Sequence, residues 1–262
     1  MTAPPNSLAK TSLAKARAEL ERRGLLLEQD RERPSLVTLV VGEPVSGSWW
    51  GHPRGAEIFA VLSALGDDPD VLLTKLVDGK VTLVARRLWP ALLAVATAHE
   101  HWQTAGLSPI ATRLLERVRA EGPLSTDQLA RDTPGRRELA AAARELERRL
   151  LVRSEQVHTE HGAHARVLDT WERFVTRASV KRLPRPDAAR QELAQVAQAQ
   201  GIGEDALPWG LAHRAMGVTA TATRAGSGKR PAARPAARST PAPQPAPKKR
   251  PSARAPARGP RR

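Results

Sequence analysis

Apolar residues recur at helical spacing near the start of the chain. Within residues 12–24 they form one stripe, made of Leu13, Ala16 and Leu20. The stripe predicts a helix with Ser12 as its N-cap and Gly24 just past its end. The next apolar run, Pro34–Gly42, contains β-branched residues that favour a strand, but its terminal Pro and Gly favour a short helix. We predict the short helix.

A third helix and a hairpin follow. Ser48 is placed to cap a helix that begins at Trp49, and apolar residues again recur at helical spacing, at Ile58, Leu62 and Leu65. Two β-prone runs then flank Asp78-Gly79. This dipeptide predicts a hairpin, because a type I′ turn needs positive φ at both central residues. The order of helix, short helix, helix and hairpin is that of a winged helix.

The second half of the chain repeats this order over residues 108–169. A helix opens at Ser108, and Ser125–Gln128 matches the capping box of a short helix. Residues 136–150 form an amphipathic pattern that predicts the third helix. Two β-prone runs around His161-Gly162 predict the wing.

The predicted fold is therefore mainly α with small β wings, in tandem winged-helix (helix-turn-helix) units followed by a disordered C-terminal tail. The predicted parts, in chain order, are a flexible N-terminus 1–11, winged-helix unit 12–89, connecting helix 90–107, winged-helix unit 108–169, C-terminal helices 170–216 and tail 217–262.

The composition excludes several classes of protein. The 262 residues contain no cysteine, so they provide neither a disulfide framework nor a thiolate nucleophile or metal ligand. No apolar run approaches the roughly 18 residues of a membrane span. The first residues lack the apolar core of a secretory signal. We therefore expect a cytoplasmic protein without membrane association.

The formal net charge of +15 is concentrated in the tail. Residues 217–262 hold 12 Lys/Arg and no Asp/Glu, which leaves 30 basic against 27 acidic residues in 1–216. Such a Pro-, Ala- and Arg-rich segment buries too little apolar surface to fold. Its composition resembles the tails of linker-histone-like and nucleoid proteins. We expect its cations, including Lys248, Lys249 and Arg250, to contact DNA phosphates on the nucleoid. A purely solubilising tail is the alternative.

The third helix of the second unit carries arginines suited to DNA. A helix-turn-helix unit lays this helix in the major groove while its wing contacts the backbone, and a guanidinium fits both phosphates and guanine edges. The candidates are Arg136, Arg137, Arg144 and Arg148 on the helix, with His158, His161, His164 and Arg166 on the wing. Interspersed glutamates allow another interpretation, a solvated face with i,i+4 ion pairs. The three histidines straddle a turn without a supporting cysteine, so we expect no metal or cofactor.

The first unit supplies a second set of candidate phosphate contacts, formed by His52, Arg54, Lys75, Lys80, Arg86 and Arg87. Its tryptophan pair, Trp49 and Trp50, has three interpretations. One ring packs in the core while the other covers the gap between wing and helix; or the pair stacks on bases or backbone; or it forms a protein interface. We predict the first and keep both tryptophans as candidate nucleic-acid contacts.

The first unit also resembles a known family. Gly47-Ser48-Trp49-Trp50, followed by a helix, an apolar strand and a basic hairpin ending in Arg86-Arg87-Leu88-Trp89, looks like the winged-helix module of AlkZ/YcaQ-type DNA glycosylases, which unhook crosslinked or alkylated bases. Further similar positions are Leu62, Leu65, Val71 and Lys75. The similarity covers residues 12–89, and it implies tandem winged helices and DNA binding.

The resemblance does not extend to a catalytic site. The family's signature is a glutamine, a hydrophobic residue and then Gln or Asp. Residues 198–200, Gln-Ala-Gln, have these letters but lie at the end of a late helix, away from both winged-helix units. P-loop, G-x-G-x-x-G, H-E-x-x-H and G-x-S-x-G motifs are also missing, and no catalytic residue is assigned.

The sequence therefore favours a double-stranded DNA-binding protein of nucleoid-associated, repair-linked or regulatory type. One alternative is an AlkZ-like glycosylase with a diverged active site. Another is a tandem winged-helix scaffold that binds a protein partner. The sequence indicates neither a target sequence nor an oligomeric state.

Overall fold

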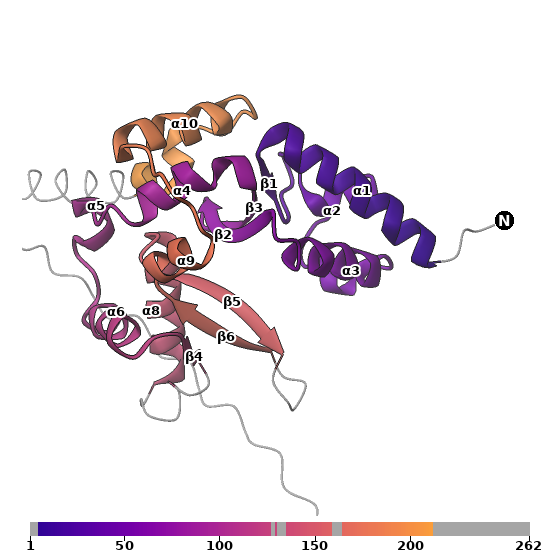
Figure 1. Ribbon diagram of the computed structural model, residues 1–262. Coiled ribbons are helices and arrows are strands. Elements are labelled where there is room, and N and C mark those ends of the chain that lie inside the picture. Colours follow the sequence, from indigo (N-terminus) through magenta and orange to yellow (C-terminus); the bar gives the residue numbers. More distant parts are fainter. Residues whose placement is uncertain (1–4, 127–128, 130–134, 159–163, 212–262) are drawn as a thin grey trace, which may run out of the picture.

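The computed structural model describes residues 5–126, 129, 135–158 and 164–211 (Figure 1). The described chain is mainly helical and contains two small antiparallel sheets. Among these residues, no helix combines the length and the apolar character needed to cross a membrane. The predicted tail, the wing residue His161 and most of the short helix predicted after Ser125 lie outside the described residues.

The first unit consists of three α-helices and a three-stranded sheet. In chain order its elements are α1 (Pro5–Arg23), β1 (Leu25–Leu27), α2 (Leu36–Val41), the 3-10 turn η1 (Trp49–Gly51), α3 (Gly55–Gly66), β2 (Val71–Val77) and β3 (Lys80–Ala85). The strand order is β1-β3-β2, with Leu83 paired to Leu26 on one side and to Leu73 on the other. The helices bury one face of this sheet around Leu20, Val37 and Ile58.

Two local predictions for this unit are confirmed. The short helix α2 is capped by Ser35, whose Oγ accepts a hydrogen bond from Thr38 N, and it ends at Gly42 with φ of 99°. The hairpin turn has positive φ at both central residues, 50° at Asp78 and 67° at Gly79. Both features are set by residues next to one another in the chain, which makes them accessible to sequence reasoning.

The start of the third helix was wrongly predicted. Trp49 and Trp50 form a 3-10 turn capped by Ser48, and α3 begins only at Gly55. His52 precedes a proline and has extended backbone, φ −74° and ψ 143°. A proline ring disfavours the α conformation of the residue before it, so the helix cannot run through this point.

The boundaries of α1 and the strand β1 also differ from the prediction. The helix begins at Pro5, so Ser12 is an interior residue and donates a hydrogen bond to Glu57 of α3 at 2.7 Å. Leu25–Leu27 pair with β3 as a strand. Three consecutive leucines have neither a helical nor a strand period, so their strand character comes only from the partner strand.

The second unit has the same sheet order. Its described elements are α6 (Pro109–Glu121), β4 (Leu124–Ser125), α8 (Arg136–Arg148), β5 (Arg153–His158) and β6 (His164–Asp169), with the strands ordered β4-β6-β5. Ser108 caps α6 by accepting a hydrogen bond from Ala111 N. The predicted pairing of two strands is confirmed, with the last described pair His158 and His164.

The predicted connecting helix is divided in two. After the 3-10 turn η2 (Arg86–Leu88), α4 (Trp89–Ala96) and α5 (His101–Thr104) are separated by a turn in which His99 has φ of 51°. Glu100 and Gln103 form a capping box that starts α5. A positive φ at a non-glycine residue cannot occur inside a helix, so the chain changes direction here.

Helix α4 is the centre of the molecule. All residues from Ala91 to Ala96 are buried, against the first sheet on one side and against α9 (Trp171–Arg177) and α10 (Pro186–Gln198) on the other (Figure 1). The 3-10 turn η3 (Glu204–Ala206) and Trp209 complete this cluster. The C-terminal helices therefore close the core of the first unit rather than forming a separate domain.

The two units meet where α8 packs on β2. Leu150, just after α8, is fully buried in the same cluster as Leu72 and Leu76 of β2. Beside it, Lys75 and Glu147 form an ion pair at 2.5 Å. This contact fixes the second unit's third helix against the first unit's sheet.

Replacing Leu92 by alanine tests the central role of α4. Leu92 is fully buried, so we expect Leu92→Ala to lower the free energy of unfolding by about 2–5 kcal/mol through lost burial and a residual cavity. Gln191→Ala, on the exposed face of α10, is the control and should change it by less than about 0.5 kcal/mol. Urea unfolding followed by tryptophan fluorescence measures both. Equal midpoints for the two variants would contradict a shared core around α4.

Candidate nucleic-acid interface

Helix α8 carries an exposed stripe of arginines. Arg137, Arg144 and Arg148 lie at the i, i+7 and i+11 positions of one face, with Ala141 between them, and all are exposed. The opposite face is buried through Leu139, Ala142, Ala143 and Leu146. The helix is thus strongly amphipathic, because its apolar side is fully used by the core of the second unit. We call Arg137, Arg144 and Arg148 the arginine stripe.

The arginine stripe is not neutralised within the described part of the protein. None of its three guanidinium groups, nor that of the neighbouring Arg136, forms an ion pair with a described residue. The i,i+4 pairing that could have consumed them occurs instead at Arg149, which lies 3.9 Å from Glu145. Glu145 also accepts hydrogen bonds from Ser108 N and Oγ, so it faces α6 and not the stripe.

The stripe ends at the hairpin of the first unit. Gly79 lies so close to Arg148 that a Cβ atom on it would be 2.9 Å from Nε of the arginine. Gly79 therefore satisfies two requirements, the positive φ of the turn and the close approach of Arg148. The turn of the β2–β3 hairpin therefore lies against the end of the arginine stripe.

Two of the predicted phosphate contacts, Lys75 and Arg166, form ion pairs with Glu147. It is only 3% exposed and lies between Lys75 Nζ at 2.5 Å and Arg166 Nη1 at 3.3 Å. Lys75 comes from β2 and Arg166 from β6, so one carboxylate joins three elements. Lys75 is itself 18% exposed. Burial of Glu147 is tolerated because both cations compensate its charge, and Lys75 is thereby withdrawn from a phosphate-contacting role.

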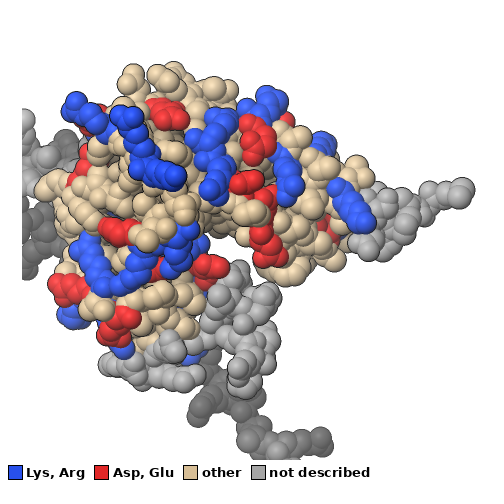
Figure 2. All heavy atoms as spheres, viewed as in Figure 1, with Lys and Arg blue, Asp and Glu red and all other residues tan. Residues whose placement is uncertain are grey.

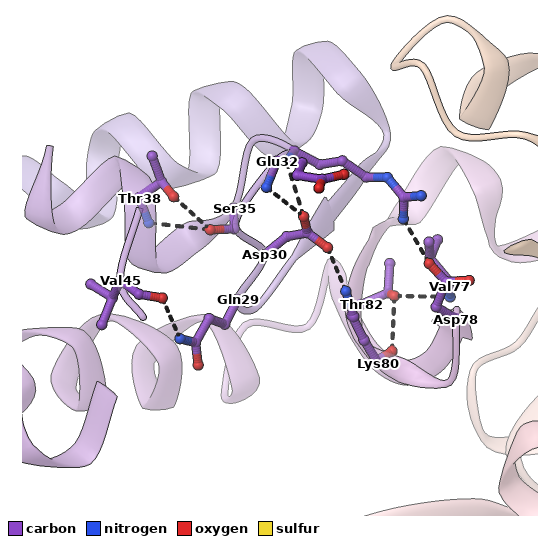
Figure 3. A network of polar contacts seen from close by, with 11 residues as sticks. Gln29, Asp30, Glu32, Ser35, Thr38, Val45, Val77, Asp78, Lys80 and Thr82 are labelled. Atoms are coloured by element: carbon purple, nitrogen blue, oxygen red, sulfur yellow. Dashed lines mark hydrogen bonds and ion pairs between the residues drawn. The ribbon is translucent and has the colours of Figure 1, made fainter. Parts of the chain in front are cut away.

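The other cation of the first hairpin, Lys80, is also paired, and so is Arg33 in the loop before α2. Lys80 donates to Asp30 at 2.6 Å, and Arg33 pairs with Asp78 at 2.8 Å (Figure 3). Figure 2 shows the same mixture on a larger scale, with Lys/Arg and Asp/Glu side chains interspersed across the face in view. The near-neutral charge balance of residues 1–216 is therefore reflected in local pairing.

Asp30 organises the loop before α2. Its Oδ1 accepts hydrogen bonds from the backbone N–H groups of Glu32 and Arg33, and its Oδ2 accepts one from Lys80 (Figure 3). Burial alone would raise the pKa of Asp30, but the bond from Lys80, the two backbone bonds and the charge of Lys80 together lower it below its ordinary value. Gln29 ties the same loop to the carbonyl groups of Val45 and Gly47.

An open groove of about 750 Å³ lies over this loop and the hairpin, with both charge signs on its walls. Three of its carboxylates are engaged: Asp30 accepts three hydrogen bonds, Glu28 accepts one from Trp49 Nε1 at 2.8 Å, and Asp78 pairs with Arg33. The fourth, Glu32, is exposed and its carboxylate has no partner among the described residues. The groove is open, so it does not supply an enclosed pocket for a base. Within the described ranges, no group of three His, Asp or Glu side chains is placed to hold a metal ion.

The tryptophan pair is half core and half surface. Trp49 is 3% exposed and packs in the first core, as predicted. Trp50 does not cover a gap. It is 64% exposed and stacks on Trp49 with 4.2 Å between ring centroids, with Phe59 of α3 at 5.7 Å. Two further candidates lie beside it: Arg54 forms a bidentate pair with Glu57, and His52 Nδ1 accepts a hydrogen bond from Arg54 N.

Arg86 and Arg87 lie at the entrance to α4. Arg86 is stacked over the Trp89 ring at 4.6 Å and donates a hydrogen bond to the Pro69 carbonyl. Arg87 donates a long hydrogen bond of 3.4 Å to the carbonyl of Glu21. Both side chains are exposed, but each also holds the turn into α4. Both arginines therefore lie at the surface of the first unit.

Sequence reasoning missed one group of exposed cations. Lys181, Arg182 and Arg185 lie between α9 and α10, are exposed, and form no ion pair with any residue in the described ranges. This segment was predicted to be helical, but α9 ends at Arg177. The sequence Lys-Arg-Leu-Pro-Arg contains a proline and three cations, which could have been interpreted as an exposed basic loop instead of the end of a helix.

Comparison with known proteins finds no matching family model, and no curated protein or solved structure is significantly similar to the chain.

Lys75→Met tests the buried ion pair between the units. The substitution leaves Glu147 with Arg166 alone, so we expect the free energy of unfolding to fall by about 2 kcal/mol. Replacing both partners, in Lys75→Met with Glu147→Met, should recover most of the loss because no buried charge remains. Lys10→Met, at an exposed position, is the control. A double variant less stable than Lys75→Met would contradict this account.

Asp30→Asn tests the polar network through pH. A lowered folded-state pKa means that the ionised carboxylate stabilises the fold above its ordinary pKa of about 3.9, and that this stability is lost as pH falls through the folded pKa. Wild type should therefore exceed Asp30→Asn by about 1–2 kcal/mol at pH 7, and the difference should shrink below about pH 4. Urea unfolding at pH 7, 5 and 3 measures it; a difference constant across that range would exclude an electrostatic role.

Proposed function

We propose that the protein binds double-stranded DNA through tandem winged helices, with α8 in the major groove. The observation that carries the proposal is the arginine stripe: three exposed guanidinium groups on one helix face, unpaired within the described residues, on a body that is otherwise close to neutral. Arginine is the residue that most often reads guanine edges and phosphates.

The order of elements supports the winged-helix part of the proposal. In each unit a hairpin follows the third predicted helix, α3 or α8, and the short first strand joins the same sheet on the far side of the last strand. In such units the helix before the hairpin is the one that enters the groove. The resemblance of residues 12–89 to the AlkZ/YcaQ-type module points the same way.

The two units contribute unequally. Helix α3 carries no Lys or Arg, whereas α8 carries the stripe. We therefore assign groove reading to the second unit. The first unit would contribute its hairpin, since Gly79 lies against Arg148 at the end of the stripe. The 12 tail cations would add affinity that depends strongly on salt, because each phosphate contact releases counterions.

Binding without base excision is the activity we propose. A glycosylase must hold a flipped base in a fitted pocket, and the groove over Asp30 is open. A protein-interaction platform is the second candidate function. It is favoured by one observation, the exposed aromatic surface formed by Trp50 and Phe59 at α3, a helix that contains no Lys or Arg.

Removing the arginine stripe tests the proposal directly. For the full chain on a labelled 30-base-pair duplex, we expect Arg137→Ala with Arg144→Ala and Arg148→Ala to weaken binding at least about tenfold. The slope of log affinity against log salt should decrease by about 2–3, one for each lost phosphate contact. Fluorescence anisotropy at several salt concentrations measures both quantities.

The matched control removes three exposed cations elsewhere, with Lys10→Ala, Lys15→Ala and Arg113→Ala. It lowers the net charge by the same amount, so a general electrostatic effect would weaken binding equally in both variants. Equal losses, or no loss in either, would refute α8 as the reader. Retained binding in the stripe variant would leave the tail as the DNA contact and the folded body as a protein platform.

A further inference from the structure

The outer face of α3 is apolar along most of its length. Its exposed positions are Ala56, Phe59 and Ala60, continued toward the N-terminal side by the 64%-exposed ring of Trp50. The helix lies at the edge of the first unit, packed on α1 and α2 by its other side (Figure 1). Exposed tryptophan and phenylalanine side chains in contact with each other are typical of a surface that binds a partner.

This aromatic face is preformed. Trp50 is held in place by stacking on Trp49, which is itself fixed in the core and by its hydrogen bond to Glu28. Gly55 allows the turn to fold tightly under α3, since a Cβ atom here would lie 3.2 Å from the carbonyl oxygens of Trp49 and Trp50. A ligand therefore meets a rigid platform and has little ordering entropy to offset on the protein side.

The end of the same face is acidic. Asp67, directly after α3, is exposed, and Asp70 is 64% exposed and pairs with Arg86 at 3.8 Å. Asp68, between them, pairs with Arg17 of α1. The carboxyl end of a helix carries partial negative charge as well. Three acids against two cations leave this end of α3 with net negative charge, which favours an apolar segment followed by cations.

The chain's own tail contains such a segment. Residues 241–251 are Pro-Ala-Pro-Gln-Pro-Ala-Pro-Lys-Lys-Arg-Pro, in which alternating prolines precede three consecutive cations, and residues 217–262 contain no acid. Proline-rich segments favour the extended polyproline II conformation and dock on aromatic surfaces at low entropic cost. Fully extended, the 29 residues 212–240 would span up to about 100 Å.

The distance from the aromatic rings to the acidic end of α3 matches the length, in polyproline II, of the tail segment between its prolines and its lysines. At 1.5 Å per helical residue, Asp67 lies about 12 Å beyond Phe59 along α3. A polyproline II segment rises about 3.1 Å per residue, so four residues, the sequence separation of Pro245 and Lys249, would cover about 12 Å in that conformation. With a proline against the aromatic rings, the lysines therefore fall at the acidic end.

We propose that residues 241–250 of the tail dock on the α3 face of the same molecule, with prolines on Trp50 and Phe59 and cations at Asp67 and Asp70. A tail docked in this way withholds its cations from other polyanions. The docking itself does not depend on the proposed DNA binding, and its test uses no DNA.

Site-specific photo-crosslinking in the full chain tests the contact. p-Benzoylphenylalanine replaces Phe59, and after irradiation the chain is separated by denaturing electrophoresis, digested with trypsin and analysed by mass spectrometry. We expect a cross-linked monomer in which position 59 is joined to the tail peptide Ser239–Lys248. The same probe at Gln191, on the exposed face of α10, should not capture this peptide.

Charge reversal at the acidic end supplies the second arm. Asp67→Lys with Asp70→Lys should reduce the Ser239–Lys248 cross-link at least about threefold, whereas Glu116→Lys, an exposed acid on α6, should leave it unchanged. A cross-linked dimer would identify a second copy as the occupant and overturn the proposal. So would cross-links confined to residues of the folded body, no cross-link, or equal yields in the two charge variants.

Discussion

The contact between α8 and β2 determines what each unit can present to a partner. Glu147, buried between Lys75 and Arg166, and Leu150, buried against Leu72 and Leu76, fix the second unit's third helix on the first unit's sheet. One side of α8 is buried in the core of the second unit, and the adjacent side is taken up by the contact with β2. What remains is the narrow arginine stripe, which ends at the turn of the first hairpin. A displacement of α8 would therefore disturb a buried charge and a hydrophobic core together.

The two units share a topology and differ in chemistry. Their sheets have the same strand order, and each places a helix before its hairpin. In α8 the outer face is cationic, whereas in α3 it is aromatic and ends in acids. The fold can carry both faces because its core needs only the inner residues, such as Ile58 in α3 and Leu146 in α8.

Locally encoded features could be predicted from the sequence. The Asp78-Gly79 turn, the caps of α2 and the amphipathic α8 depend on residues within a few positions of one another. The strand Leu25–Leu27 could not, because three leucines acquire strand character only from β3. The break before α3 was available in principle from Pro53, whose ring excludes helix at His52.

The candidate site was harder to predict for the same reason. Lys75 has the composition of a phosphate contact, but its partner Glu147 is 72 residues away and comes from the other unit. Lys80 similarly meets Asp30 across 50 residues. A sequence shows which cations exist, whereas the fold decides which of them are already paired. Arg137 and Arg144 remained candidates because their helix could be oriented by its own apolar period.

The burial of α4 beneath α10 has a consequence for how the protein is made. About 90 residues separate the end of α4 from the start of α10. Ribosomes add roughly 5–20 residues per second, so the segment Ala91–Ala96 waits about 5–20 s for its cover. During that interval the first sheet can already cover one side of α4, whereas the side that α10 covers stays exposed as a continuous apolar surface.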